Sequence, residues 1–231
     1  MENKVVLITG CSSGFGKKLC EILSSRNYYV IATARNQKTL DTVPAKLKLA
    51  LDVSSEESIQ QAMASIQEKT GQIDILINNA GYSVRSAMEE LSIDALQNMY
   101  QVNVFGLLRM TQAVLPLMRE QGHGRIFNIG SISGRMVSMV NGGYCSSKYA
   151  VEAITDATFH NTNSPYHKLY DKNITFQAKQ TRADITVCAT RLANILEKRR
   201  LKTRYTIGVS PIYKLFIHMP DNTKEFIIRR F

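Results

Sequence analysis

Tyr144 and Lys148 stand four residues apart in the stretch GGYCSSKYA, which covers residues 142–150. On an α-helix this spacing places both side chains on one face. A phenol beside an ammonium group can exchange a proton near neutral pH, because the cation stabilises the phenolate. At about 4 Å and an effective dielectric constant near 20, the attraction is roughly 4 kcal/mol, or about three pKa units below the ordinary value near 10. The pair therefore predicts a tyrosine acid/base whose pKa is lowered by lysine.

The spacing needs support from the surrounding elements. Because the chain has 10 tyrosines, roughly one Tyr-x-x-x-Lys pair is expected by chance, and an ordinary surface pair is the alternative. Short apolar runs alternate with amphipathic stretches along the chain, which indicates a parallel α/β sheet. No repeat or linker interrupts the pattern, so we predict a single domain over residues 1–231. The predicted strands cover 4–9, 28–34, 47–53, 73–81 and 124–131, and the predicted helices cover 16–25, 54–71, 93–119 and 143–160. The second of these helices begins with a predicted capping box, Ser54 with Glu57.

Three glycines follow the first predicted strand in the segment TGCSSGFG: Gly10, Gly14 and Gly16. Glycine lets the backbone turn sharply and approach a phosphate where a Cβ atom would clash. The helix N-terminus that follows offers free N–H groups and a partial positive charge to a pyrophosphate. Because the turn joins a strand to a helix, it predicts a dinucleotide site; a turn that uses glycine only for packing is the alternative.

The end of the second predicted strand, roughly 20 residues past the glycines, indicates which dinucleotide binds. An acidic residue there would hydrogen-bond a ribose 2′-hydroxyl and repel a 2′-phosphate. The sequence IATARNQK has Arg35 and Asn36 instead, with no acid. A guanidinium group stays charged and matches a phosphate with two hydrogen bonds. We therefore expect NADP (NADPH) and regard NAD as the less favoured cofactor, the alternative being a surface arginine.

With the glycine turn, NNAG and YCSSK, the stretch from Lys4 to about residue 160 resembles the short-chain dehydrogenase/reductase family of the single-domain kind. The sequence around these motifs is most similar to that of family members acting on retinoid- or steroid-like alcohols. The resemblance implies an α/β Rossmann fold, a doubly wound parallel sheet with helices on both faces. It also implies that Asp52 contacts the adenine ring and that Asn78-Asn79-Ala80-Gly81 lies along the cofactor. The implied cofactor-binding residues are Gly10, Ser12, Ser13, Gly14, Phe15, Gly16, Arg35, Asn36, Asp52, Val53, Asn79, Ala80, Gly81, Tyr144 and Lys148.

Asn103, Ser131, Tyr144 and Lys148 match the catalytic tetrad of the family. The resemblance implies that Ser131 holds the substrate oxygen against Tyr144 and that Lys148 also binds the nicotinamide ribose. Asn103 would help to hold a water that links Lys148 to solvent. The implied reaction interconverts an apolar alcohol and its ketone or aldehyde by hydride transfer. Taken singly, Ser131 has the alternative role of a strand-end cap, and Asn103 that of a helix-packing amide.

The sequence departs from the family pattern after residue 160. The family supplies a sixth strand, then a Pro-Gly turn whose next residues grip the nicotinamide, and then a substrate lid. We find no apolar strand run and no Pro-Gly pair, so we expect the strand and lid to be missing around 160–161. Either the full protein contains a segment absent from this sequence, or the final strand, 203–209, closes the sheet beside the fifth. The second case favours a catalytically silent NADP(H)-binding or regulatory protein, because a misplaced nicotinamide impairs hydride transfer. Helices are further predicted at 164–172 and 181–201, and the tail 210–231 either packs as two short helices or shields an apolar substrate entrance.

Composition limits the partners. Hydrophobic residues make up 44% of the chain and charged residues 21%, which is typical of globular proteins. No apolar run approaches the roughly 18 residues of a membrane span, and the start has no signal-peptide pattern. The four cysteines show neither metal-ligand nor disulfide spacing, so we expect a cytoplasmic protein without a metal. The net charge of +10 is spread along the chain without aromatic interleaving, so we expect no nucleic-acid partner. The predicted partners are a small apolar alcohol or carbonyl substrate and, by analogy with the family, further copies in a homodimer or homotetramer.

Overall fold

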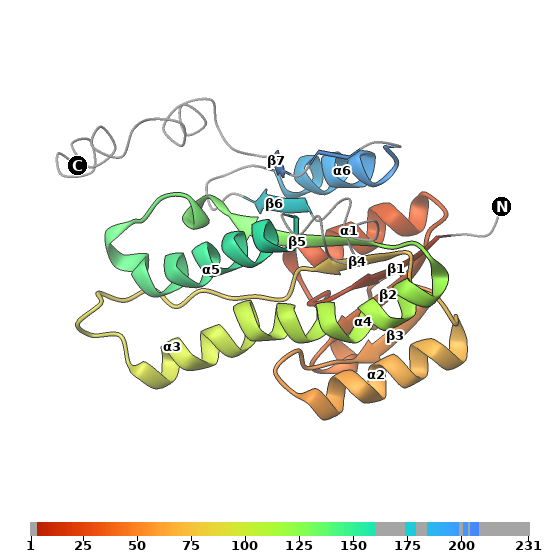
Figure 1. Cartoon of the computed structure of the whole chain (residues 1–231), viewed down its shortest axis with the longest axis horizontal. Helices are drawn as coiled ribbons and strands as arrows, with labels where there is room; N and C mark the ends of the chain where they lie inside the picture. The colour runs from red at the N-terminus through yellow and green to blue at the C-terminus, as the bar shows by residue number, and fades with distance from the viewer. Residues whose placement is uncertain (1–3, 160–173, 179–183, 199–200, 203, 208–231) are drawn as a thin grey trace.

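The computed structural model describes residues 4–159, 174–178, 184–198, 201–202 and 204–207 (Figure 1). Its strands are β1 (Val5–Ile8), β2 (Tyr29–Ala34), β3 (Leu47–Ala50), β4 (Ile75–Asn78), β5 (Arg125–Ser131), β6 (Ile174–Ala178) and β7 (Arg204–Thr206). They form one parallel sheet in the order β3-β2-β1-β4-β5-β6-β7. The chain thus winds outward from β1 in one direction and from β4 in the other. This is the doubly wound Rossmann arrangement that we expected.

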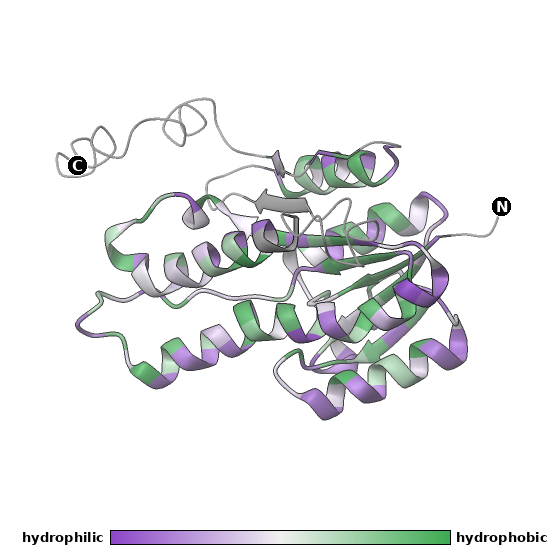
Figure 2. Cartoon of the chain, viewed as in Figure 1, coloured by the Kyte–Doolittle hydropathy of each residue, from purple (hydrophilic) through white to green (hydrophobic). Residues whose placement is uncertain are grey.

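Both faces of the sheet are covered by helices. Side chains of β1 alternate between two cores: Val6 and Ile8 pack with α1 (Gly14–Ser25) and α6 (Ile185–Leu196), whereas Val5 and Leu7 pack with α2 (Glu56–Lys69) and α4 (Leu107–Gln121). Strands covered on both sides are apolar along their whole length, and every residue of β1 is buried. Figure 2 shows the central strands in the hydrophobic colour and mixed colours along α2.

The long helix predicted at 93–119 consists of three consecutive parts. These are α3 (Ile93–Tyr100), the π-helical segment η2 (Gln101–Gly106) and α4. Single π-helical turns are rare and occur frequently at functional sites. This one contains Asn103 and contacts α5 (Gly142–Phe159), the helix that follows β5 and carries Tyr144 and Lys148.

Four buried polar side chains join the elements that support the site. The Asn78 side-chain nitrogen donates to Thr111 Oγ1 at 3.1 Å and to Asn128 Oδ1 at 3.0 Å. The Asn128 side-chain nitrogen in turn donates to Thr155 Oγ1 at 3.0 Å. The row connects α4, β4, β5 and α5, and each such bond contributes about 1 kcal/mol. It fixes α5 relative to the centre of the sheet.

The expectation of a missing sixth strand is wrong. Strand β6 lies between β5 and β7, and Ser131 is paired with Ala178 in its register. Its sequence, ITFQA, is short and alternates apolar with polar residues, so it lacks the continuous apolar run that we sought. Its position also means that β7 does not lie beside β5. No Pro-Gly pair follows β6 in the sequence, and residues 179–183 lie outside the described part.

Other expectations are corrected in detail or lie outside the described residues. Ser55, not Ser54, caps α2 by accepting a hydrogen bond from the Ser58 N–H at 3.2 Å. Ser54 turns back to Asp52 instead, which breaks the predicted capping box. The helix predicted at 181–201 is α6, whereas the helices predicted at 164–172 and in the tail 210–231 fall outside the described part.

Candidate active site

The turn between β1 and α1 is tied to the loop that follows the neighbouring strand β4. Thr9 Oγ1 accepts hydrogen bonds from the backbone N–H groups of Asn79 and Ala80, both at 3.0 Å. The Asn79 side chain donates to the carbonyl groups of Thr9 at 2.8 Å and Gly10 at 2.9 Å. The TG and NNAG motifs therefore form one rigid unit at the carboxyl edge of the sheet.

Two glycines in this unit leave no room for a side chain. Gly10 has a φ of +71°, and a Cβ atom on it would lie 2.9 Å from Ala80 Cα. A Cβ atom on Gly16 would collide with the Gly10 carbonyl oxygen and with the Asn79 side-chain nitrogen, 2.5 Å away. Ser13, the N-cap of α1, makes no side-chain cap bond, and the first turn of α1 has no acidic residue. The first turn of α1 is thus electrostatically suited to a pyrophosphate.

A cleft of about 400 Å³ runs along this unit. It contains most of the predicted cofactor residues but not Asn36, whose side-chain oxygen instead accepts from the Lys38 N–H at 3.0 Å. Gly16, Tyr144 and Lys148 are also absent from the lining, and Gly16 lies behind the turn. The cleft is lined by Gly10, Ser12, Ser13, Gly14, Phe15, Ala34, Arg35, Leu51, Asp52, Val53, Asn79, Ala80, Gly81, Tyr82 and Val102.

Arg35 and Asp52 mark one end of the cleft. The Asp52 carboxylate accepts from the Ser54 N–H at 2.9 Å and from the Ser54 hydroxyl at 2.6 Å, which fixes its orientation. Arg35 is exposed and lines both the cleft and an adjoining hollow of about 530 Å³, together with Tyr82 and Val102. Within the described residues Arg35 has no ion-pair partner, so its charge is available to an anion.

The other end of the site brings Ser131, Tyr144 and Lys148 together. Ser131 ends β5, is 1% exposed and accepts a hydrogen bond from the Ser133 N–H at 3.1 Å. Lys148 Nζ lies 5.9 Å from the centre of the Tyr144 ring and donates to the Ile129 carbonyl at 2.8 Å. A Cβ atom on Gly81 would lie 3.8 Å from Lys148 Nζ, so the lysine reaches the edge of the cleft.

The ionisation of this group differs from our expectation. Burial raises the pKa of Tyr144, and a hydrogen bond with Ser131 lowers it by less. The sequence predicted that lysine would lower this pKa, which is wrong for the cofactor-free protein. The ammonium group lies 5.9 Å from the centre of the Tyr144 ring and donates its hydrogen bond to the Ile129 carbonyl instead. Burial also lowers the pKa of Lys148 to about 8, although the nearby Glu152 carboxylate acts in the opposite direction.

Asn103 is buried and links three elements. Its side-chain oxygen accepts from the Tyr82 N–H at 3.0 Å, and its nitrogen donates to the Tyr82 carbonyl at 2.9 Å and to Ser147 Oγ at 3.1 Å. Ser147 Oγ also donates to the Tyr144 carbonyl at 2.7 Å. The amide therefore fixes η2 and the NNAG loop to α5.

Sequence reasoning missed several residues of the site. Ser147 lies within YCSSK, one helical turn from Tyr144, so helical spacing could have singled it out. Glu152 lies one turn beyond Lys148 and is 5% exposed. Tyr82 follows the NNAG motif, but only the structure shows that it lines the cleft and that Asn103 holds its backbone.

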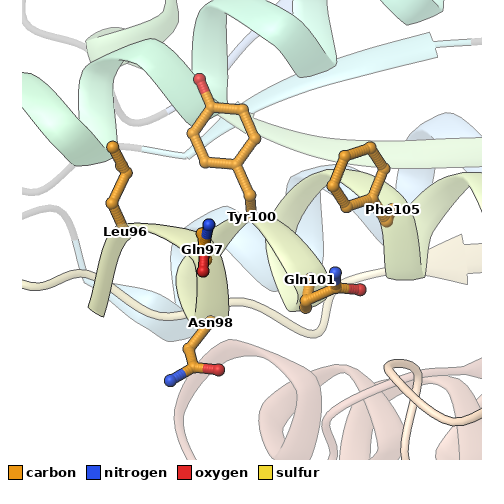
Figure 3. Close-up of a pocket in the computed structure, with 6 residues that line it drawn as sticks. All are labelled: Leu96, Gln97, Asn98, Tyr100, Gln101 and Phe105. Atoms are coloured by element: carbon orange, nitrogen blue, oxygen red, sulfur yellow. The ribbon is translucent and has the colours of Figure 1, made fainter. Parts of the chain in front are cut away.

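A second hollow of about 590 Å³ is lined by residues of α3 and η2 (Figure 3). Leu96, Tyr100 and Phe105 project from one side of the helix and Asn98 from the other. It shares no lining residue with the 400 Å³ cleft. Within the described part of the chain, no helix has the length and apolarity of a membrane span, and no group of His, Cys, Asp and Glu is arranged for a metal ion.

Residues 4–167 match the family model described as short chain dehydrogenase. The chain is 38% identical over 157 residues to a 3-ketodihydrosphingosine reductase from Bacteroides thetaiotaomicron, a match that covers 68% of this chain and 58% of that protein. It is 39% identical over 171 residues to 17-beta-hydroxysteroid dehydrogenase type 1 from Homo sapiens, covering 68% and 52%. The chain thus spans little more than half the length of these relatives. In fold it is similar to a short-chain dehydrogenase from Streptomyces avermitilis, with a TM-score of 0.83 at 24% identity, covering 100% of this chain and 95% of that one.

Proposed function

Because the chain belongs to the short-chain dehydrogenase family, we propose that it is an NADP(H)-dependent oxidoreductase that interconverts an apolar alcohol and its ketone or aldehyde. One observation carries the proposal: Ser131 and Lys148 both lie against Tyr144, and Lys148 Nζ lies beside Gly81 at the edge of the cleft that the glycine turn lines. The turn fits the cofactor because it excludes side chains and presents the uncapped N-terminus of α1. When bound, the nicotinamide supplies or accepts a hydride.

The roles of the side chains follow from their positions. In the reducing direction, the Tyr144 hydroxyl donates its proton to the carbonyl oxygen of the substrate as hydride reaches carbon. Burial keeps this phenol protonated, which suits a proton donor. Ser131 hydrogen-bonds the same oxygen and orients it. Lys148, beside Gly81 at the edge of the cleft, binds the nicotinamide ribose, and Asn103 supports proton relay by holding the loop at Tyr82.

Arg35 supports NADPH over NADH. It lines the cleft at the end of β2, where the family reads the ribose 2′ position, and it also lines the adjoining hollow. Asp52, the carboxylate nearby, is already engaged by Ser54. A 2′-phosphate would therefore meet an available guanidinium group.

Exposed apolar side chains near the start of α5 support an apolar substrate. Met139 is 78% exposed and Met88 is 57% exposed. Their segments lie side by side, because the Ser86 N–H donates to the Val140 carbonyl at 3.1 Å. A Cβ atom on Gly142, the first residue of α5, would lie 2.6 Å from the Met88 sulfur. The names of the two curated relatives, a ketodihydrosphingosine reductase and a hydroxysteroid dehydrogenase, agree with this choice of substrate.

A catalytically silent NADP(H)-binding or regulatory protein is the second candidate. The family-model match ends at residue 167, and the sequence after β6 has no Pro-Gly pair. In the family, the residues that follow this Pro-Gly pair hold the nicotinamide amide. A protein that binds NADPH through the glycine turn but cannot fix the nicotinamide would be catalytically silent.

The deciding experiment measures NADPH binding and turnover in one preparation. NADPH binding is titrated by fluorescence, and oxidation of NADPH is followed at 340 nm (a property of the dihydronicotinamide) with long-chain, steroid and short-chain ketones and aldehydes. Turnover with the apolar carbonyls supports the oxidoreductase. Tight binding without turnover of any carbonyl supports the silent protein.

Replacing Tyr144 by phenylalanine tests the acid/base. Tyr144→Phe should lower kcat by at least about 100-fold, because the proton donor is lost while the ring is kept. The dissociation constant of NADPH should change little. Retained activity would show that another group supplies the proton.

We also propose a reducing, cytoplasmic setting and a homodimer or homotetramer. All four cysteines are free and buried, which agrees with a reducing compartment. The exposed aromatic residues Phe105 and Tyr149 lie on the long helix and on α5, the two helices through which family members often pair. Light scattering of wild type and Phe105→Glu measures whether this face carries the contact, since a buried charge would dissociate it.

A further inference from the structure

The turn that carries Ser131 is attached to the catalytic helix by an ion pair outside the tetrad. After β5 the chain forms a short helical turn, η3 (Ile132–Gly134), followed by Arg135. Arg135 Nε and Nη2 both reach Glu152 Oε2 at 3.2 Å, and the Glu152 side chain is 7% exposed. A buried carboxylate is stable only when it is paired, so the contact constrains both elements.

Close packing reinforces this attachment. A Cβ atom on Gly134 would lie 2.8 Å from the Lys148 carbonyl oxygen and 2.9 Å from Glu152 Cγ. The backbone N–H of Arg135 donates to the Ile132 carbonyl at 2.9 Å, which closes the turn. Arg135 thus directly follows the residue at which the turn packs against α5. Its side chain reaches Glu152, which lies one helical turn beyond Lys148.

We propose that Arg135 and Glu152 form a positioning pair, which fixes the Ser131 turn to α5 and supplies the negative charge next to Lys148. The inference rests on the proposed function, because the reaction needs Ser131, Tyr144 and Lys148 at one substrate oxygen. Neither residue lines the 400 Å³ cleft. They act through Ser131, which is placed by the turn that it begins. They also act through Lys148, because the Glu152 carboxylate favours the charged form of its side chain.

The charges around Lys148 determine how the pair acts. On α5 the ionisable neighbours of Lys148 are Tyr144 and Glu152, and Arg135 lies on the other side of Glu152 as its ion-pair partner. In the described residues, β5, the NNAG loop and η2 present the Ile129 carbonyl, Gly81 and Asn103, none of which ionises. Removing the carboxylate should therefore favour neutral Lys148, whereas removing the guanidinium should favour the cation.

The first test measures the protonation of Lys148 directly, without turnover. Carbon-13 labelling of lysine Cε separates this residue, because ordinary lysines titrate near 10.4 and its pKa is lowered to about 8. The signal is assigned by its loss in Lys148→Met. Glu152→Gln, which keeps a hydrogen-bond acceptor for Arg135, should lower this pKa by about one unit, and Arg135→Ala should raise it.

Shifts of opposite sign support the pair, since a purely structural role would not produce them. An unchanged Lys148 titration in both variants overturns its electrostatic part. Glu21→Gln is the matched control, because Glu21 pairs with Lys18 on the outer part of α1 at 2.8 Å and should leave the signal unchanged.

The second test measures positioning by kinetics. Arg135→Ala should lower kcat about 10- to 100-fold with an unchanged NADPH dissociation constant, since the substrate oxygen is held less well. Arg135→Lys, which keeps a cation opposite Glu152, should recover much of the loss. A kcat of Arg135→Ala within twofold of the wild type overturns the positioning role.

The two proposals fail in different ways. If wild type turns over no carbonyl compound, the proposed function fails, while the lysine titration still decides whether the pair acts on Lys148. If wild type is active and neither variant alters the titration or kcat, only the positioning pair is refuted. Thermal unfolding of each variant, run alongside, ensures that the measurements are made on folded protein.

Discussion

Around the glycine turn the site is built from backbone, whereas around Tyr144 it is built from buried polar side chains. Gly10 and Gly16 are packed so closely that a Cβ atom would collide, and Asn79 ties the turn through main-chain carbonyl groups. At the other end, three buried side chains each make a hydrogen bond of their own: Ser131 with Tyr144, Asn103 with Ser147, and Lys148 with the Ile129 carbonyl.

The two ends should therefore be sensitive to different changes. The end at the glycine turn depends on shape, so we expect an added methyl group to harm it and a change of pH to have little effect. The end at Tyr144 depends on charge that the interior disfavours: Lys148 is 6% exposed, and burial lowers its pKa to about 8. Substitutions that change only the shape of one end, or only the charge of the other, test this comparison.

The largest effect is expected at Gly16. Gly16→Val would force a side chain against the Gly10 carbonyl and Asn79, so the free energy of unfolding should fall by about 3 kcal/mol and NADPH binding by at least about 100-fold. Urea denaturation and NADPH titration measure both. Gly122→Ala is the control, since it adds about 1 kcal/mol of strain at a positive φ far from the cleft. Normal NADPH binding by Gly16→Val would contradict the close-packed turn.

A smaller effect of opposite sign is expected at Lys148. Its pKa of about 8 in the folded protein lies below the ordinary 10.5, so between these values the unfolded chain binds the extra proton and wild-type stability rises with pH. Below pH 8 the buried cation destabilises the fold. Lys148→Met should therefore unfold with about 2 kcal/mol more free energy at pH 7, after allowing for the lost bond to Ile129.

Urea denaturation at pH 7 and pH 10 checks this, because the advantage of the variant should shrink as the pH rises. Equal free energies of unfolding for the two proteins at pH 7 would mean that the buried Lys148 cation does not destabilise the fold. Lys69→Met is a control for the loss of charge alone, since Lys69 is exposed on α2.

The next effect concerns cofactor choice. Arg35→Ser should weaken NADPH binding by about 10- to 100-fold, the value of a charge-assisted hydrogen bond, and leave NADH binding nearly unchanged. Competitive titration of the two dinucleotides measures the ratio. Lys69→Ser controls for the change in net charge. Tighter binding of NADH than NADPH by the wild type would refute the role of Arg35.

The smallest effect is expected at Ser54. Ser54→Ala removes the 2.6 Å hydrogen bond that orients Asp52 but keeps the one from the backbone N–H. NADPH binding should weaken by about 1 kcal/mol, or several-fold. A titration of this variant beside Ser65→Ala, a half-buried serine on α2, shows whether the orientation of Asp52 matters.

Local sequence predicted the turn, the tyrosine–lysine pair and most of the sheet. It could do so because glycine spacing and helical periodicity act within a few residues. It missed β6, which is short and alternates apolar with polar residues instead of forming an apolar run. It placed Asn36 in the cleft, although its side chain is used to cap the next turn.

What the sequence determined by itself is the chemistry at hand: a phenol and an ammonium group four residues apart, a glycine turn after a strand, and an arginine where an acid would select NAD. What only the tertiary structure decided is how these groups ionise and what holds them. The pKa of Tyr144 is raised instead of lowered, and Glu152 meets Arg135 from a different element. Burial and contacts between distant segments depend on how the whole chain packs, which no local pattern specifies.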